Sequence, residues 1–262
     1  MKIACVQMDI EYGKPNENFK HVTESISEAA QNGADCIVLP EMWNTGYALQ
    51  QLGDLADLEG KETIKLLSSL ALKYNVNIVG GSVSVKTSKG YFNRMYVFNR
   101  FGEVISEYDK AHLFNVMDEH QYLIAGQKEN LFKIDGNMSG GLICYDIRFP
   151  EWVRKHALAG AKLIFVVAEW PEARVDHWVT LLKARAIENQ LFIIAVNRVG
   201  KDPNNTFGGF SMVINPWGDT IAIGSTAESI LYADLNIQEV DQVRTRISVF
   251  EDRREDLYNR KK

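Results

Sequence analysis

Three side chains of this 262-residue sequence could together carry out acyl transfer. Glu41, Lys110 and Cys144 each come where a predicted buried strand ends, and strand ends meet at one edge of an α/β sheet. A thiol becomes a nucleophile when a base takes its proton, and a carboxylate whose pKa is raised by burial can be that base. An ammonium group stabilises the oxyanion that forms when the thiol attacks a carbonyl. These residue types therefore predict chemistry through a thioester on Cys144.

Spacing alone leaves ordinary roles open for the same residues. Most cysteines are buried core thiols, Glu41 could be the first acid of a helix, and Lys110 could be a solvated surface lysine. Cys5 and Cys36 lie inside apolar runs, and we expect both to be core thiols. Charged residues follow Cys144, and thiols in such settings have a lowered pKa, so we expect Cys144 to be the reactive one.

The elements that must position these groups alternate between strand and helix, which is typical of an α/β fold. Apolar residues recur at helical spacing from Asn16 to Gln31, and Gly33 follows as a helix stop. A polar loop is expected to reach about Gly126, and the tail is expected to form a short helix and an extended arm. Helices are predicted over 16–31, 61–74, 150–159 and 174–189, and strands over 2–8, 35–39, 76–85, 91–99, 103–108, 131–134, 139–144, 162–167, 191–196, 210–215, 220–223 and 230–235.

The order of elements is the same in the two halves of the chain, which indicates an internal duplication. The segment from Gly33 to Trp43 matches the segment from Gly160 to Trp170, and the turn at 99–103 matches the turn at 215–219. Two such halves, each a sheet with helices on one side, would bury their bare sheet faces against each other. The pattern predicts a four-layer α-β-β-α sandwich as one domain over residues 1–262, with a C-terminal arm from about residue 236.

Several motifs resemble the nitrilase superfamily of carbon–nitrogen hydrolases, and they span nearly the whole chain in that family's order. The resemblance implies the α-β-β-α sandwich, a catalytic triad of Glu41, Lys110 and Cys144, no metal or other cofactor, and a homodimer. It also implies a second glutamate in the loop after the lysine, which falls on Glu119, although a surface acid is the alternative there. The matching segments are 39–42, 108–113, 141–151, 177–190 and 215–218.

Within this superfamily the chain looks most like the ω-amidases, which remove ammonia from the terminal amide of 2-oxoglutaramate or 2-oxosuccinamate. Nitrilases usually carry Trp after the catalytic cysteine, whereas Tyr145 stands here, and its backbone N–H is expected to face the oxyanion. A substrate carboxylate needs a cation in the pocket, best an arginine. Arg148 and Arg174 are the candidates, and Trp170 is a candidate for the pocket wall. Arg148 could instead pair with a neighbouring acid, and Arg174 could be a surface residue.

Composition limits the remaining functions. A net charge of −5 without a basic stripe argues against a nucleic-acid partner. The apolar runs are too short for a membrane span, and no cleavable leader precedes the first strand, so a cytoplasmic protein with reduced thiols is expected. The alternatives to an amidase are an N-carbamoyl amide hydrolase, a nitrilase, and a non-catalytic metabolite-binding relative, which the intact triad argues against.

Overall fold

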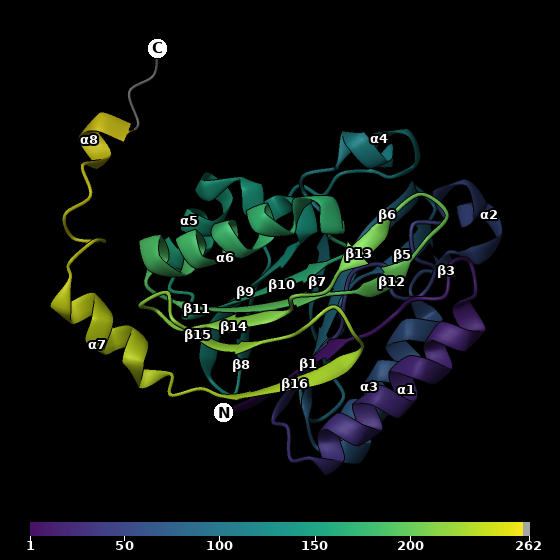
Figure 1. The fold of residues 1–262 in the computed structure, drawn as a ribbon, viewed down its shortest axis with the longest axis horizontal. Helices are drawn as coiled ribbons and strands as arrows, with labels where there is room; N and C mark the ends of the chain where they lie inside the picture. The colour runs from purple at the N-terminus through teal and green to yellow at the C-terminus, as the bar shows by residue number, and fades with distance from the viewer. Residues whose placement is uncertain (259–262) are drawn as a thin grey trace.

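The computed structural model describes residues 1–258, and its strands form two large sheets (Figure 1). In the first sheet β1, β2 and β4 run parallel to one another, and the sheet continues from β4 into the antiparallel β6. In hydrogen-bonded order its strands are β16 (Ser229–Asp234), β1 (Lys2–Gln7), β2 (Cys36–Val38), β4 (Asn77–Val79), β6 (Gly90–Phe98), β5 (Val83–Thr87) and β3 (Asp57–Leu58), and β7 (Val104–Asp109) also pairs with β6.

The second sheet repeats this arrangement. Its parallel strands β9, β10 and β11 correspond to β1, β2 and β4, and its antiparallel β14 and β15 correspond to β6 and β7. An antiparallel edge strand completes each set, β8 beside β9 and β16 beside β1, which confirms the predicted pseudo-symmetric halves. In order the strands are β15 (Thr220–Ile223), β14 (Met212–Ile214), β11 (Phe192–Asn197), β10 (Leu163–Ala168), β9 (Asn137–Ile143) and β8 (Leu131–Ile134); β12 (Val199–Lys201) and β13 (Thr206–Gly208) pair separately.

Helices cover the outer face of each sheet, which gives the predicted four layers (Figure 1). Helices α1 (Pro15–Gln31) and α3 (Lys61–Tyr74) cover the first sheet, and α5 (Pro150–Leu158) and α6 (Val175–Asn189) cover the second. The shorter helices are α2 (Leu52–Leu55), α4 (Glu119–Tyr122), α7 (Gln238–Arg246) and α8 (Glu255–Tyr258). No helix within residues 1–258 is both long enough and apolar enough to cross a membrane.

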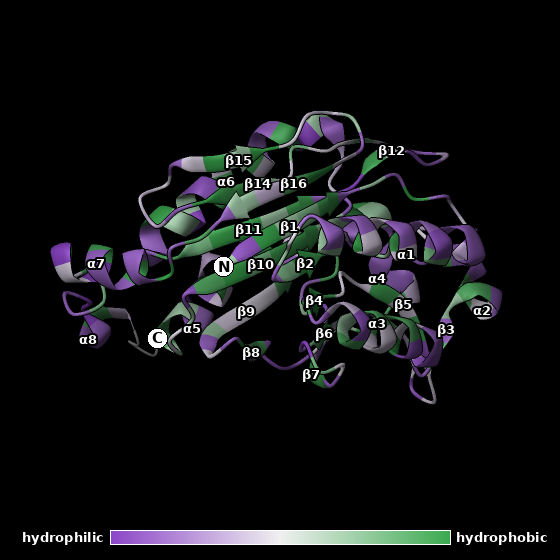
Figure 2. Cartoon of the chain, turned by 90° about the horizontal axis from the view of Figure 1, so that it is seen from below, coloured by the Kyte–Doolittle hydropathy of each residue, from purple (hydrophilic) through white to green (hydrophobic). Residues whose placement is uncertain are grey.

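The alternation of side chains along the strands explains the layers. In β1, Cys5 lies in the cluster that contains Ile194 of the opposite sheet, whereas its neighbour Ala4 packs with Ile26 of α1. Successive residues of a strand point to opposite faces, so an apolar strand can fill the core between the sheets and the core under a helix at once. Figure 2 shows these central strands as mostly hydrophobic, while α1 also carries hydrophilic residues along its length.

Several features differ from the sequence predictions. The single strand expected over 76–85 is wrong, because Gly80 and Gly81 separate β4 from β5, and Gly81 turns the chain with φ +60°. The loop expected to reach Gly126 contains α4 and a short 3₁₀ turn, Asn115–Met117. The small β12–β13 pair has no counterpart among the predicted strands. The tail forms α7 and α8, and the end of the expected arm, 259–262, lies outside the described residues.

The turn at Gly81 generates a stability prediction. A Cβ atom at Gly81 would meet the backbone carbonyl of Pro40, the residue before Glu41, whereas a Cβ at Gly33 (φ +79°) meets nothing within 4 Å. Both substitutions force alanine into the left-handed region, which lowers the free energy of unfolding by about 1–2 kcal/mol. Gly81→Ala should lower the free energy of unfolding by roughly 1–3 kcal/mol more than the control Gly33→Ala does, because the backbone around residue 81 must also shift. Urea unfolding measures both, and equal losses would contradict the prediction.

Candidate active site

The structure brings Glu41, Lys110 and Cys144 together between the two sheets. Glu41 follows β2, Lys110 directly follows β7, and Cys144 directly follows β9. Glu41 and Lys110 are fully buried and Cys144 is 5% exposed. Strand ends from both sheets therefore converge on one buried site, as the sequence predicted from the position of each residue after a strand.

The Lys110 ammonium group lies between two carboxylates. Its Nζ atom is 2.9 Å from Oε1 of Glu41 and 2.6 Å from Oε1 of Glu119. Glu119 begins α4 and is fully buried, whereas its exposed neighbour Asp118 adopts a positive φ of 59°. The buried position and the contact with Lys110 distinguish Glu119 from the surface acid that the sequence left as an alternative.

Two residues that the sequence analysis missed hold these carboxylates in place. The Tyr47 hydroxyl donates toward Glu41 and forms a short hydrogen bond with Glu119, and the Asn93 side-chain amide donates to Glu41 at 2.8 Å. Asn93 interrupts the apolar run of β6 at a buried position, which was a usable signal because buried polar groups need partners. Tyr47 lies in the long loop after β2, and no local pattern marked it.

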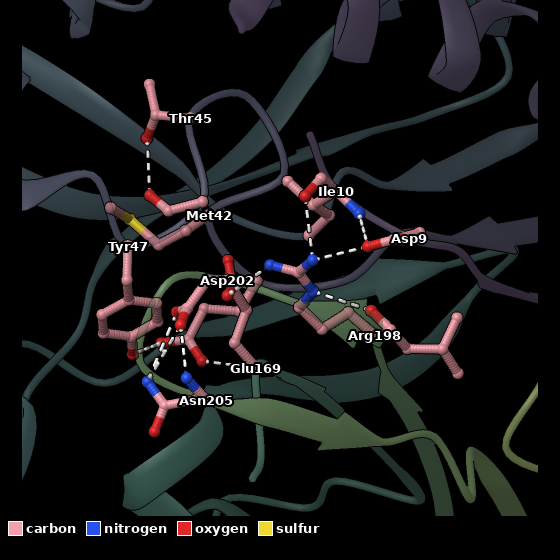
Figure 3. A network of polar contacts seen from close by, with 12 residues as sticks. Asp9, Ile10, Met42, Thr45, Tyr47, Glu169, Arg198, Asp202 and Asn205 are labelled. Carbon is pink, nitrogen blue, oxygen red and sulfur yellow. Dashed lines mark hydrogen bonds and ion pairs between the residues drawn. The ribbon is translucent and has the colours of Figure 1, made fainter. Parts of the chain in front are cut away.

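The second sheet also holds Glu41. The backbone N–H of Glu169, the residue that follows β10, donates to Oε2 of Glu41 at 2.8 Å. The Glu169 side chain pairs with Arg198, whose Nη1 atom is 3.0 Å away (Figure 3). Arg198 in turn donates to Asp9 and to the carbonyl of Ile10. The buried Glu41 carboxyl group is thus connected to both sheets through hydrogen bonds.

Burial and neighbouring charges set the protonation states. Burial alone would lower the pKa of Lys110, but Glu119 and Glu41 raise it well above its ordinary value, so Lys110 is an ammonium ion. Burial raises the pKa of the Cys144 thiol well above its usual range, and the Glu41 carboxylate raises it further. The lowered thiol pKa expected from the sequence is therefore wrong. Cys144 is a neutral thiol that reacts when a base removes its proton.

The turn that presents Cys144 is built around Asp146. Cys144 has a positive φ of 46° and begins the 3₁₀ segment Cys144–Arg148. One Asp146 oxygen accepts hydrogen bonds from the Ile143 backbone N–H and the Tyr108 hydroxyl, and the other accepts from the backbone N–H of His112. The His112 ring also contacts Asp146 at 2.7 Å, so this histidine ties the segment after Lys110 to the Cys144 turn.

A small pocket is lined by Cys144. Arg148 lies over the Trp170 ring, 4.7 Å from its centre, and contacts His177, so it does not form the acidic pair considered as an alternative. Arg174 lies 5.5 Å from the centre of the Phe114 ring. All four residues predicted around the substrate line the pocket; the lining consists of Phe114, Cys144, Tyr145, Arg148, Glu169, Trp170, Pro171 and Arg174.

The two tryptophans at matching positions of the two halves have different roles. Trp170 lines the pocket, and its backbone N–H donates to Asn197 at 2.6 Å. Trp43 is fully buried in the core beside Phe19, and its indole N–H donates to the carbonyl of Gly80. Cys5 and Cys36 are fully buried core thiols, as predicted. Within the described chain, no three His, Cys, Asp or Glu side chains are grouped so that they could hold a metal ion.

The comparisons with known proteins agree with this geometry. A family model described as carbon-nitrogen hydrolase matches residues 2–245. The chain is 50% identical over 256 residues to the 2-oxoglutaramate amidase of Bacillus subtilis (strain 168), with 98% of each chain covered. It is 33% identical over 254 residues to the omega-amidase YafV of Escherichia coli (strain K12), with 96% of each covered. It also resembles a cysteine-to-alanine mutant of the amidase from Nesterenkonia sp. AN1 in complex with butyramide: the TM-score is 0.85, the identity is 25%, and 98% of this chain and 95% of that chain are covered.

The chain therefore belongs to the carbon–nitrogen hydrolase family, in the nitrilase superfamily. Its reaction class is the hydrolysis of amides, and it resembles the ω-amidases within that superfamily.

The position of Cys144 leads to a prediction about the nucleophile. Cys144→Ala should lower amide turnover by at least about 10³-fold with folding retained, because no other thiol reaches the pocket. The matched control, Cys36→Ala, removes a thiol from the core of the sandwich and should keep turnover. Ammonia release measures activity, and circular dichroism verifies folding. Turnover by Cys144→Ala near that of the parent protein would exclude a covalent mechanism.

Proposed function

We propose that this enzyme hydrolyses the terminal amide of a small carboxylate-bearing amide, of the 2-oxoglutaramate or 2-oxosuccinamate type, to the acid and ammonia. The observation that carries the proposal is the pair of arginines, Arg148 and Arg174, in the pocket that opens on Cys144. A carboxylate leaving water for this pocket needs a cationic partner. The name of the Bacillus subtilis relative, a 2-oxoglutaramate amidase, supports the same substrate class.

The first half of the reaction forms the thioester. Glu41 takes the proton of the Cys144 thiol while the sulfur attacks the amide carbonyl carbon. The Lys110 ammonium and the backbone N–H of Tyr145 stabilise the negative charge that develops on the carbonyl oxygen. Glu41 then gives its proton to the amide nitrogen, the carbon–nitrogen bond breaks, and ammonia leaves with the acyl group bound to sulfur.

The second half returns the enzyme to its starting state. Glu41 takes a proton from a water molecule, whose oxygen attacks the thioester carbon. The carbon–sulfur bond breaks, the thiolate of Cys144 recovers a proton from Glu41, and the carboxylic acid product leaves. Glu119 keeps Lys110 charged and in position, since its Oε1 contacts Nζ and its Oε2 accepts the backbone N–H of Phe114 at 2.7 Å.

Arg174 is the better placed of the two arginines to bind the substrate carboxylate. Its guanidinium donates no hydrogen bond to any side chain or carbonyl within residues 1–258 and rests only on the Phe114 ring. Arg148 contacts His177 through Nη2 at 3.3 Å and lies over the Trp170 ring. A guanidinium that is held by a ring but has free donors can bind a carboxylate in the bidentate manner.

This assignment is tested by the charge preference of two variants. Arg174→Met should lower the ratio of kcat/KM for succinamate over butyramide by roughly 30-fold or more, about 2–5 kcal/mol, because the carboxylate loses its partner. Arg148→Met is the matched control and should change this ratio less. Ammonia release gives both constants.

Other outcomes of the same assay reject parts of the proposal. Equal kcat/KM for succinamate and butyramide in the parent enzyme would refute a carboxylate-bearing substrate. A preference for N-carbamoyl compounds or nitriles would assign the enzyme to another reaction of the superfamily. A larger effect of Arg148→Met would transfer the carboxylate contact to that residue.

We also infer that the protein is cytoplasmic and that residues 1–262 form one domain with an arm from about residue 236. We infer in addition that two copies of this domain form a homodimer. Exposed apolar residues gather where α6 meets the β14–β15 turn: Ile187, Trp217, Ile221 and Ile223 are 53%, 40%, 41% and 49% exposed. A Cβ on Gly218 would touch Ile187, so this turn packs directly against α6. Such a patch is typical of an interface between subunits.

The dimer proposal is tested by one charge on this patch. Ile187→Glu should weaken dimerisation by at least about tenfold, because it would bury an unpaired carboxylate. The control Leu72→Glu changes a residue that is 61% exposed on α3, over the other sheet, and should leave the dimer intact. Sedimentation velocity measures both variants. A monomeric parent protein, or an unchanged dimer in Ile187→Glu, would contradict the proposal.

A further inference from the structure

One buried carboxylate oxygen in the Cys144 pocket takes no part in the mechanism described so far. Glu169 is fully buried, directly follows β10, and lines the pocket together with Cys144. Its Oε1 atom has no hydrogen-bond partner within residues 1–258. A buried polar atom without a partner costs free energy, so a pocket that contains one is suited to a ligand that supplies the missing hydrogen.

The other oxygen of Glu169 is firmly held, so the free one cannot turn away from the pocket at low cost. Arg198, itself fully buried, donates from Nη1 to Oε2 of Glu169 (Figure 3). The remaining nitrogens of Arg198 are engaged as well: Nε donates to the carbonyl of Val199, and Nη2 donates to Asp9 and to the carbonyl of Ile10. Arg198 therefore fixes the orientation of the Glu169 carboxyl group and leaves Oε1 as its free oxygen.

The other acids of the site do not offer an equivalent oxygen. Both oxygens of Glu119 are occupied, by Lys110 and Tyr47 on one side and the backbone N–H of Phe114 on the other. Glu41 uses Oε1 for Lys110, Tyr47 and Asn93, and it must exchange a proton with Cys144. The backbone N–H of Glu169 donates to Glu41, so Glu169 is directly adjacent to the carboxyl group that protonates the departing nitrogen in the proposed mechanism.

We propose that Glu169 is a further specificity-determining residue, whose Oε1 accepts a hydrogen bond from the N–H₂ group of the substrate amide. The inference rests on the proposed amidase function and adds the recognition of the leaving group. An acceptor at this place favours an unsubstituted amide over an ester, whose alkoxy oxygen has no hydrogen to donate. It also turns the nitrogen toward Glu41, which must protonate it.

The test measures binding without turnover, in Cys144→Ala protein. The probes are succinamate and monomethyl succinate, which differ in an amide N–H₂ against a methoxy group, and calorimetry gives each Kd. Because an amide carbonyl is also the better acceptor for Lys110, the informative quantity is the change in the Kd ratio when Glu169 is altered. Burial raises the pKa of Glu169 to about 8, so the calorimetry is done at about pH 9, where Glu169 is ionised and a hydrogen bond to its charged oxygen predicts a change of about tenfold or more.

Glu169→Gln is the decisive variant. Arg198 can only donate, so the glutamine oxygen must face Arg198 and the glutamine N–H₂ must face the pocket. The variant should therefore weaken the binding of succinamate and leave the Kd of monomethyl succinate nearly unchanged. If the binding of both ligands is weakened equally, Glu169 has only a structural role. A Kd ratio of the two ligands that Glu169→Gln leaves unchanged overturns the proposal. If Glu169→Gln does not fold, a ratio near one in Cys144→Ala protein alone overturns it.

A second pair of probes separates this inference from the proposed substrate class. Butyramide and methyl butyrate differ in the same amide and ester groups but carry no carboxylate for Arg174. If the amide-to-ester Kd ratio depends on Glu169 in both pairs but succinamate binds no more tightly than butyramide, the role of Glu169 is retained. The proposal of a carboxylate-bearing substrate is then rejected. The converse result would retain the acidic substrate and reject the role of Glu169.

Discussion

The placement of the Lys110 ammonium between two buried carboxylates is the interaction on which the rest of the site depends. A charge removed from water is tolerated only when partners and hydrogen bonds replace its hydration, and here Glu41, Glu119 and Tyr47 do so around one nitrogen. One positive and two negative charges leave the cluster with a net negative charge beside Cys144. Burial, and after it the charge of Glu41, raises the pKa of the thiol, so the thiol loses its proton to a base as it attacks a substrate.

The duplicated fold lets this cluster form, because the two halves supply different residues to it. The first half supplies Glu41 after β2, and the second supplies Cys144 after β9. The matched tryptophans have separated into a core residue, Trp43, and a pocket residue, Trp170. Burying the two sheets against each other brings the strand ends into one enclosed space, and the hydrogen bond from the Glu169 backbone to Glu41 crosses directly between the halves.

The sequence predicted what is encoded locally and in order along the chain. Strand and helix patterning gave the layers, and the strand-end positions and motifs of Glu41, Lys110 and Cys144 located the site. The strand over 76–85 was wrong because its division depends on a positive φ at Gly81, which alternation of apolar residues does not reveal. The direction of the thiol pKa was wrong because burial and the charges of residues distant in sequence outweigh the polar groups next to Cys144.

The distribution of charge in the pocket also gives the reaction a direction. The acids Glu41, Glu119 and Glu169 are fully buried, whereas Arg148 and Arg174 are only partly buried and line the pocket. For the proposed substrate, the carboxylate binds at the arginines and the neutral amide faces the acids. Hydrolysis turns that amide into a carboxylic acid, and loss of its proton to water makes a second carboxylate beside a cluster that already holds two carboxyl groups and one ammonium group. Repulsion in this low-dielectric space therefore weakens binding of the product relative to the substrate and favours its release.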